Sequence, residues 1–207
     1  MTDSTKGQTV IFDLGQVICP FDLMIPCGKL SRMNGMSPED IKQRIFFGEV
    51  ERDFETGRIT GEAFAARCNE LLGLTLPLEV FRDLWCDMFH LNEAALQLVD
   101  DVRESSQVLM LSNTCAWHIA HVERLFHLRR HFDDWVLSFE VGAMKPDERI
   151  YRAALEKVRL PDRCVFIDDL QVNVDAAGGL GIPGIRFSSV EQTRAELIER
   201  GFLAAKR

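Results

Sequence analysis

Polar side chains follow four short apolar runs of this sequence, in an order that could assemble one reactive site. Asp13 comes directly after VIF, and Ser112 comes after VLML. Lys145 stands a few residues beyond WVLS, and the pair Asp168 and Asp169 follows VFI. Carboxylates are the hard oxygen ligands that Mg²⁺ prefers, while a lysine, a hydroxyl and backbone N–H groups can hold phosphate oxygens. A carboxylate facing a metal-bound phosphate can attack phosphorus, and water can hydrolyse the resulting aspartyl phosphate.

The apolar runs have the composition of short, buried β-strands. They predict strands at 9–14, 107–111, 135–138, 163–167 and 184–187. Helical patterns lie between them, such as 92–104, which Asn92 opens, and 146–158, which has a proline in its first turn. This alternation predicts a parallel sheet covered on both faces. Because the carboxyl ends of parallel strands share one edge, we expect the polar residues to meet there.

Residues 22–90 interrupt the alternation. They contain no convincing strand and several helix starts, including Ser37 followed by Pro38 and two acids. The segment is too long for a plain connection and would stand over the carboxyl edge of the sheet, where open α/β folds bind ligands. We therefore predict an α/β fold in which a Rossmann-like catalytic core of residues 1–21 and 91–207 carries an inserted, all-helical cap of residues 22–90.

Composition excludes several classes of partner. The net charge of −8 opposes nucleic-acid binding, which needs a basic surface. No apolar run approaches the roughly 18 residues of a membrane span, and the polar start MTDSTKGQ lacks signal-peptide features, so we expect a cytoplasmic protein. The six cysteines are scattered, which predicts reduced, mostly buried thiols. The expected partner is a small phosphorylated metabolite. The sequence does not indicate an oligomeric state.

Four ordered segments resemble the motifs of the haloacid dehalogenase superfamily, in its subfamily I with a helical cap. They read VIFDLGQVI, VLMLSNT, VGAMKPDERIY and VFIDDLQVNVDAAGGLGI. The cap sequence FETGRITGEAF and the SNT-x-x-x-H run resemble a narrower branch. That branch includes sugar-phosphate phosphatases, among them ones acting on glucose 1-phosphate, and the N-terminal phosphatase domain of soluble epoxide hydrolases. The resemblance implies a Mg²⁺-dependent phosphatase that hydrolyses a small phosphate monoester, with a sugar phosphate as the expected substrate.

The resemblance also implies a role for each matching position. Asp13 would be the catalytic nucleophile, and Lys145 would pair with the nucleophile and the phosphate. Ser112 and Asn113 would bind phosphate. His118 in the SNT-x-x-x-H run is a further candidate for phosphate binding, with an exposed or capping histidine as the alternative.

The same resemblance implies a Mg²⁺ site. Its ligands would be Asp13, the Gly15 carbonyl and Asp169, while Asp168 would support the ion directly or through water. Asn173 is either a more distant contact of this site or a helix-surface amide. In the cap, Glu55 and Arg58 are candidates to line the pocket.

Other cap residues have a different expected place. Trp85 and Phe89 also fall where they could reach the pocket, but bulky aromatic residues at helical spacing more often fill a core. We therefore expect both in the core of the cap.

Gly15 departs from the pattern of typical phosphatases in the superfamily, which carry a second Asp there as general acid and base. A general acid typically contributes ~10²–10⁴-fold, so its loss should slow poor leaving groups most, and Gly15→Asp should raise their turnover unless it clashes with the cap. Members of the narrower branch resemble this sequence in carrying Gly.

Two alternative functions stay open. One is a dehalogenase-like hydrolase that uses the same Asp13 attack, although dehalogenating members usually have a Tyr at this place, and the other is a non-catalytic phosphometabolite-binding module.

Overall fold

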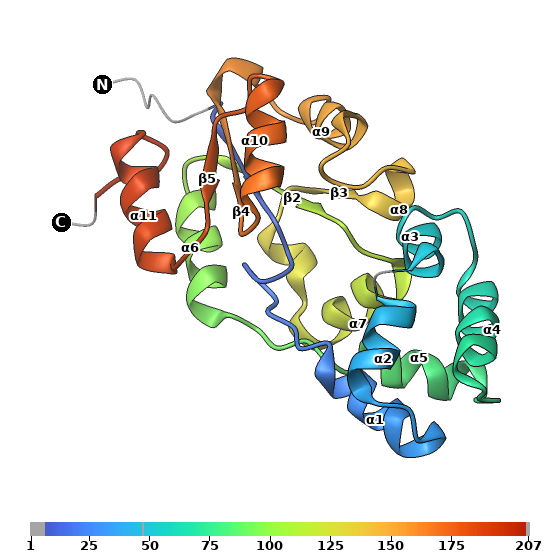
Figure 1. Ribbon diagram of the computed structural model, residues 1–207. Helices are drawn as coiled ribbons and strands as arrows, with labels where there is room; N and C mark the ends of the chain where they lie inside the picture. Colours follow the sequence, from blue (N-terminus) through green and yellow to red (C-terminus); the bar gives the residue numbers. More distant parts are fainter. Residues whose placement is uncertain (1–6, 47, 206–207) are drawn as a thin grey trace.

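The computed structural model describes residues 7–46 and 48–205. A five-stranded sheet with the order β3-β2-β1-β4-β5 forms its centre (Figure 1). Every neighbouring pair is parallel, as the sequence predicts, and β1 is the central strand. The strands are β1 Thr9–Phe12, β2 Gln107–Ser112, β3 Asp134–Leu137, β4 Cys164–Asp168 and β5 Gly184–Arg186.

Helices cover both faces of the sheet, which explains why the middle residues of its central strands are apolar. Side chains alternate across β1, so Val10 and Phe12 join one buried cluster while Ile11 joins another on the opposite face. The first face carries α6 Glu93–Arg103, α7 Ala116–Phe126 and α11 Val190–Glu199. The second face carries α9 Glu148–Leu155 and α10 Gln171–Gly179. Three short helices complete this part: α8 Ser138–Val141, η1 Leu128–His131 and η2 Pro161–Arg163.

Five further helices form a separate group beside the carboxyl edge of the sheet (Figure 1). They are α1 Met24–Asn34, α2 Pro38–Ile45, α3 Glu49–Glu55, α4 Gly61–Leu72 and α5 Leu78–Cys86. The described residues between 22 and 90 contain no strand, and the Ser37 side chain caps α2 by accepting from the Asp40 N–H at 3.1 Å. These helices enclose their own buried cluster, with Phe64 and Trp85 among its largest members. The predicted fold class, a Rossmann-like core with a helical cap, is confirmed; the exact boundaries of the two parts stay a prediction.

The chain enters and leaves the cap through two neighbouring segments. Phe21 and Phe89 form a single antiparallel bridge, and their rings meet edge to face at 5.8 Å. The Asp22 N–H donates to the Met88 carbonyl at 3.1 Å, and the His90 N–H donates to the Pro20 carbonyl at 2.9 Å. The Phe21 ring is thereby held at the base of the cap.

One predicted helix starts later than expected. The pattern at 146–158 places proline in the first turn, whereas α9 begins at Glu148 with Asp147 as its N-cap. The Asp147 side chain accepts from the Arg149 N–H at 3.0 Å, and a carboxylate satisfies a free helix N–H better than a proline can. Lys145 lies in the loop before α9 with either start, and its side chain can reach the ends of other strands from there.

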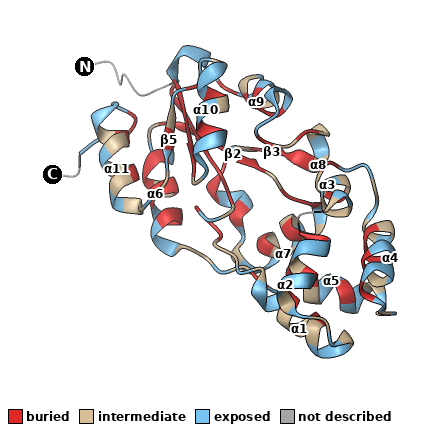
Figure 2. Ribbon diagram, viewed as in Figure 1, coloured by how far each residue is buried: buried red, intermediate tan, exposed pale blue. Residues whose placement is uncertain are grey.

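Composition also predicted the state of the cysteines correctly. All six are free and buried, and burial raises the pKa of their thiols. Burial follows the strands and the inner faces of the helices in both parts (Figure 2). Within residues 7–46 and 48–205, no helix has the length and apolar character needed to cross a membrane.

Candidate active site

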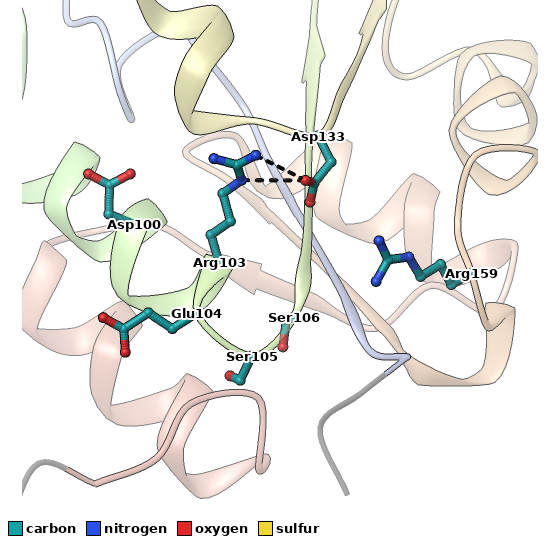
Figure 3. Close-up of a pocket in the computed structure, with 7 residues that line it drawn as sticks. All are labelled: Asp100, Arg103, Glu104, Ser105, Ser106, Asp133 and Arg159. Atoms are coloured by element: carbon teal, nitrogen blue, oxygen red, sulfur yellow. Dashed lines mark hydrogen bonds and ion pairs between the residues drawn. The ribbon is translucent and has the colours of Figure 1, made fainter. Parts of the chain in front are cut away.

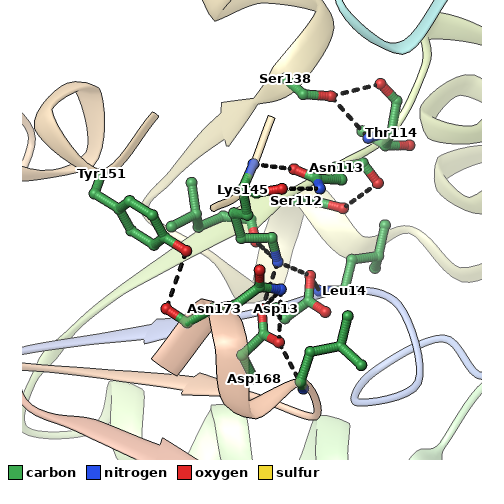
Figure 4. A network of polar contacts seen from close by, with 12 residues as sticks. Asp13, Leu14, Ser112, Asn113, Thr114, Ser138, Lys145, Tyr151, Asp168 and Asn173 are labelled. Carbon is green, nitrogen blue, oxygen red and sulfur yellow. Dashed lines mark hydrogen bonds and ion pairs between the residues drawn. The ribbon is translucent and has the colours of Figure 1, made fainter. Parts of the chain in front are cut away.

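Lys145 links the ends of three strands in one buried network (Figure 4). Its Nζ donates to Asp13 Oδ1 and to Asp168 Oδ2, both at 2.7 Å, and to the Leu111 carbonyl of β2 at 3.1 Å. The lysine side chain is 2% exposed and the Asp168 side chain 0%. The expected convergence of these residues at the carboxyl edge of the sheet is what the geometry shows. An ammonium this deeply buried is stable only because carboxylates face it.

The network carries more negative charge than Lys145 can balance. Asp13, Asp168 and Asp169 each offer a carboxylate oxygen, and these oxygens lie within 4.8 Å of one another. Burial raises the pKa of Asp13 to about 7; Lys145 lowers it, while Asp168 and Asp169 raise it again. Burial also raises the pKa of Asp169, with Asp168 as the next cause. A divalent cation would relieve this repulsion, and an all-oxygen donor set suits Mg²⁺.

The lysine stays charged in this setting. Burial disfavours its ammonium, but Asp13 and Asp168 outweigh that effect and raise the pKa of Lys145 above its ordinary value. Asp13, the candidate nucleophile, accepts a second hydrogen bond: the Leu14 N–H donates to its Oδ1 at 2.7 Å. One oxygen of Asp13 is therefore fixed by two donors, whereas Oδ2 accepts no hydrogen bond from the described residues.

Asp168 is held by its own strand–helix turn. The Leu170 N–H donates to Asp168 Oδ1 at 2.8 Å, and Asn173 Nδ2 donates to both carboxylate oxygens at 3.0 and 3.1 Å. Asn173 is buried, and its carbonyl accepts from the Tyr151 hydroxyl at 3.0 Å. Of the two alternatives for Asn173, the helix-surface amide is thus wrong. Tyr151 was not anticipated, because its partner is a backbone carbonyl that no sequence pattern marks.

The Asn113 side chain contacts the backbone of Lys145. Its Oδ1 accepts from the Lys145 N–H at 2.7 Å, and its Nδ2 donates to the Lys145 carbonyl at 3.0 Å. The amide thus clamps the backbone of the lysine and positions it, which leaves only the Asn113 backbone for a phosphate. Ser112 is buried at the end of β2, where its hydroxyl makes a long contact of 3.3 Å with the Asn113 carbonyl.

A second clamp fixes the loop after β2. The Thr114 N–H donates to Ser138 Oγ at 2.9 Å, and that hydroxyl donates to the Thr114 carbonyl at 2.9 Å. Ser138 was missed as a candidate, although its place at the carboxyl end of β3 is a signal that the sequence contains.

His118 lies among aromatic side chains of the cap. Its ring stacks on Trp85 with centroids 5.8 Å apart and meets Phe89 edge to face at 5.0 Å. Burial lowers the pKa of His118 to about 3, so the ring is neutral. No hydrogen bond in the described part of the chain connects it to Asp13 or Lys145. Its predicted contact with phosphate gains no support from this position, and the exposed alternative is wrong because the ring is 5% exposed.

Gly15 stands two residues beyond Asp13, and Phe21 fills the space beside it. A Cβ atom added to Gly15 would lie 3.0 Å from Phe21 Cε1 and 4.0 Å from Asp13 Oδ2. Since the base of the cap holds the Phe21 ring, a longer side chain at position 15 requires that ring to move.

A pocket of about 540 Å³ lies at the opposite, amino-terminal edge of the sheet, around the start of β2 (Figure 3). Arg103 crosses it to pair with Asp133 at 3.3 Å. The pocket contains none of the residues of the buried network. It is therefore separate from the candidate active site.

Solved structures share this architecture. A HAD family enzyme from Bacteroides thetaiotaomicron, solved as a magnesium complex, matches with a TM-score of 0.77 and 26% identity over 88% of this chain and 94% of that one. The same enzyme with magnesium and inorganic phosphate gives a TM-score of 0.79 and 24% identity over 87% and 94%. L-2-haloacid dehalogenase from Xanthobacter autotrophicus, with chloropropionic acid covalently bound, matches with a TM-score of 0.64 and 18% identity. The match covers 96% of this chain and 84% of that one.

Sequence comparison gives a relative and a family. Acyl-CoA dehydrogenase family member 10 of Mus musculus is 28% identical over 201 residues, which is 92% of this chain but only 19% of that protein. The chain thus spans about a fifth of the length of this relative. The family model of haloacid dehalogenase-like hydrolases matches residues 9–181, which include every residue of the buried network. This chain therefore belongs to the haloacid dehalogenase-like hydrolase family.

Proposed function

We propose that this hydrolase is a Mg²⁺-dependent phosphatase that cleaves a small phosphate monoester, with a sugar phosphate as the expected class, through an aspartyl phosphate on Asp13. The observation that carries the proposal is the buried cluster of three carboxylates around Lys145. Attack on a carbon–halogen bond would need neither Mg²⁺ nor the pair Asp168 and Asp169, whereas this surplus of acids fits a divalent cation and an anionic substrate.

Each residue of the network has a place in the proposed reaction. Lys145 and the Leu14 N–H orient Asp13 through Oδ1, while Oδ2 stays open on its other side. The Ser112 hydroxyl and the Asn113 backbone would hold phosphate oxygens, together with the lysine ammonium. Asn173 keeps Asp168 in the position that receives the lysine.

The metal would be held by Asp13, Asp169 and the Gly15 carbonyl, with Asp168 behind them. When bound, Mg²⁺ would offset the charge of the carboxylates and of the phosphate oxygens, which otherwise repel one another. Its presence in the Bacteroides enzyme, once with inorganic phosphate, supports this assignment. The dehalogenase alternative is favoured only by the likeness of fold to the Xanthobacter enzyme.

Removal of the metal should stop turnover. We expect excess chelator to abolish phosphate release and added Mg²⁺ to restore it, because the three acids repel an anionic substrate without a cation. Asp169→Asn should raise the Mg²⁺ concentration for half-maximal activity at least about tenfold, since it removes a charged ligand. Titration of activity with Mg²⁺ measures this. Asp175→Asn, on the exposed side of α10, is the control and should leave the titration unchanged. Full activity in chelator would contradict the metal assignment.

Restoring the missing carboxylate should not help in this protein. Gly15→Asp is expected to leave turnover of alkyl phosphates no higher than in the wild type and to lower stability by about 1–3 kcal/mol, because its side chain meets Phe21. The sequence predicts a rise in turnover unless the added side chain clashes with the cap, and the contact with Phe21 is such a clash. Initial rates with an alkyl phosphate and urea unfolding would measure both effects. Faster turnover by Gly15→Asp, at unchanged stability, would show that the Phe21 ring yields freely.

A substrate panel tests the function itself. Phosphate release should be measured in Mg²⁺ with sugar phosphates, nucleotides and an aryl phosphate, and with a 2-haloacid as the dehalogenation substrate. Release of phosphate from at least one ester supports the phosphatase. Release of halide without metal would favour the dehalogenase alternative, and tight binding of an ester without turnover would favour a phosphometabolite-binding module.

A further inference from the structure

The proposed phosphatase lacks a proton donor beside its nucleophile, and the inference made here rests on that proposed function. Departure of an alkoxide from phosphorus requires a proton, and water that attacks the aspartyl phosphate must lose one. Gly15 offers no side chain for either transfer, and Phe21 occupies the adjoining space. The donor must therefore come from another element.

Glu55, the last residue of α3, lies on the cap side of the site. It lines a pocket of about 340 Å³ together with Glu51, Phe46 and Met144, the residue before Lys145. Lys145 lies close enough for its charge to lower the pKa of Glu55, yet no hydrogen bond joins the two. The pocket thus connects the cap carboxylate with the loop that carries Lys145.

Close packing fixes the end of α3 against the core. The ring of Phe54 meets Trp117 of α7 edge to face at 5.0 Å. Gly57 has a φ of 67°, and a Cβ there would lie 2.3 Å from the Phe139 carbonyl oxygen of α8. Figure 1 shows α3 next to α8. Only glycine allows this approach, so the chain holds Glu55 between two anchor points on the core.

The Glu55 carboxyl makes no hydrogen bond and no ion pair within the described residues. Burial raises its pKa to about 7, and Lys145 opposes the rise. Glu51 lies one turn earlier in α3, and burial, aided by Glu55, raises its pKa to about 10. Glu51 is therefore neutral near pH 7. The Cys115 thiol on the core side is neutral as well, since burial raises its pKa well above the ordinary value. Glu49 and Arg52 also line this pocket, but burial and Lys145 are what set the pKa of Glu55. Near neutral pH Glu55 can therefore both give and take a proton.

We propose that Glu55 is the general acid and base of this enzyme, supplied by the cap in place of the missing Asp. In the first step Asp13 forms a bond to phosphorus, the bond from phosphorus to the leaving oxygen breaks, and the Glu55 carboxyl gives its proton to that oxygen. In the second step water attacks phosphorus, the Glu55 carboxylate takes the proton of the water, and the acyl phosphate bond to Asp13 breaks. The alcohol and inorganic phosphate are released, and Glu55 is protonated again.

The test compares two leaving groups in Glu55→Gln. An alkyl phosphate needs protonation of its leaving oxygen, whereas p-nitrophenyl phosphate needs little. We expect kcat for the alkyl phosphate to fall by about 10²–10⁴-fold and kcat for the aryl phosphate to fall much less, since only the poor leaving group depends on a general acid in the first step. Wild-type kcat for the alkyl phosphate should decline above about pH 7 as Glu55 loses its proton, and Glu55→Gln should flatten this decline.

Two controls make the result specific. Glu62→Gln changes an exposed glutamate of the neighbouring cap helix α4 and should leave kcat unchanged for both substrates. Glu55→Asp keeps the carboxyl and should recover part of the alkyl-phosphate activity. An equal loss with both substrates, or a raised KM at unchanged kcat, would overturn the assignment and make Glu55 a binding residue. If the wild type released no phosphate from p-nitrophenyl phosphate or from any other ester, the phosphatase function and this inference would both be wrong.

Discussion

Asp13→Asn is expected to abolish turnover of every substrate, with kcat/KM lower by about 10⁴–10⁶-fold. The substitution removes the attacking carboxylate and one of the charges that would hold Mg²⁺, so no alternative route through the remaining residues is available. The size of the side chain is unchanged, and Lys145 keeps Asp168 as its partner. We therefore expect the fold to persist, which near-ultraviolet circular dichroism would show.

The measurement is phosphate release under single-turnover conditions, in which acid quenching would trap an aspartyl phosphate in the wild type and none in Asp13→Asn. Asp22→Asn serves as the control, because Asp22 lies at the base of the cap, away from the buried network. Retention of more than a hundredth of the wild-type rate by Asp13→Asn would contradict covalent catalysis by this residue.

Lys145→Met should give the largest loss of stability. It removes the only ammonium that faces Asp13 and Asp168 in the described structure, and it leaves two carboxylates buried together. Loss of one partner from a buried ion pair typically costs about 3–5 kcal/mol in the free energy of unfolding. Activity should be lost as well, because the same ammonium orients Asp13 and faces the phosphate.

This destabilisation should depend on pH in a defined direction. Without Lys145, burial and Asp168 raise the pKa of Asp13 unopposed by the lysine. A carboxyl with a raised pKa in the folded state destabilises the fold above the unfolded-state pKa, because the unfolded chain then releases its proton more readily. Urea unfolding of metal-free protein should therefore show a smaller loss at pH 4 than at pH 7. Arg152→Met removes an exposed pair with Glu148 and should lose no more than about 1 kcal/mol. Equal losses in the two variants would contradict the central role of Lys145.

Local sequence signals predicted the strands of the sheet and the edge of the sheet at which the candidate site lies. The β-branched and apolar runs predicted all five strands because burial on both faces of a parallel sheet demands such residues. Ser37 and Asn92 predicted helix starts, and both side chains accept the capping N–H that their types favour. Parallel strands have their carboxyl ends at one edge, so the order of the elements alone brought Asp13, Lys145 and Asp168 together.

The tertiary structure decided which surface each side chain of the site faces. Asn113 holds the Lys145 backbone, although the two residues are far apart in sequence. Phe21 fills the space beside Gly15, and no sequence pattern indicates this contact. His118 turns into the aromatic core of the cap, whereas Glu55 is carried toward Lys145. Periodicity and capping report only the few residues around a position. The placement of the cap on the core depends instead on close packing between distant segments, such as Gly57 against Phe139, and this packing is determined only when the whole chain is folded.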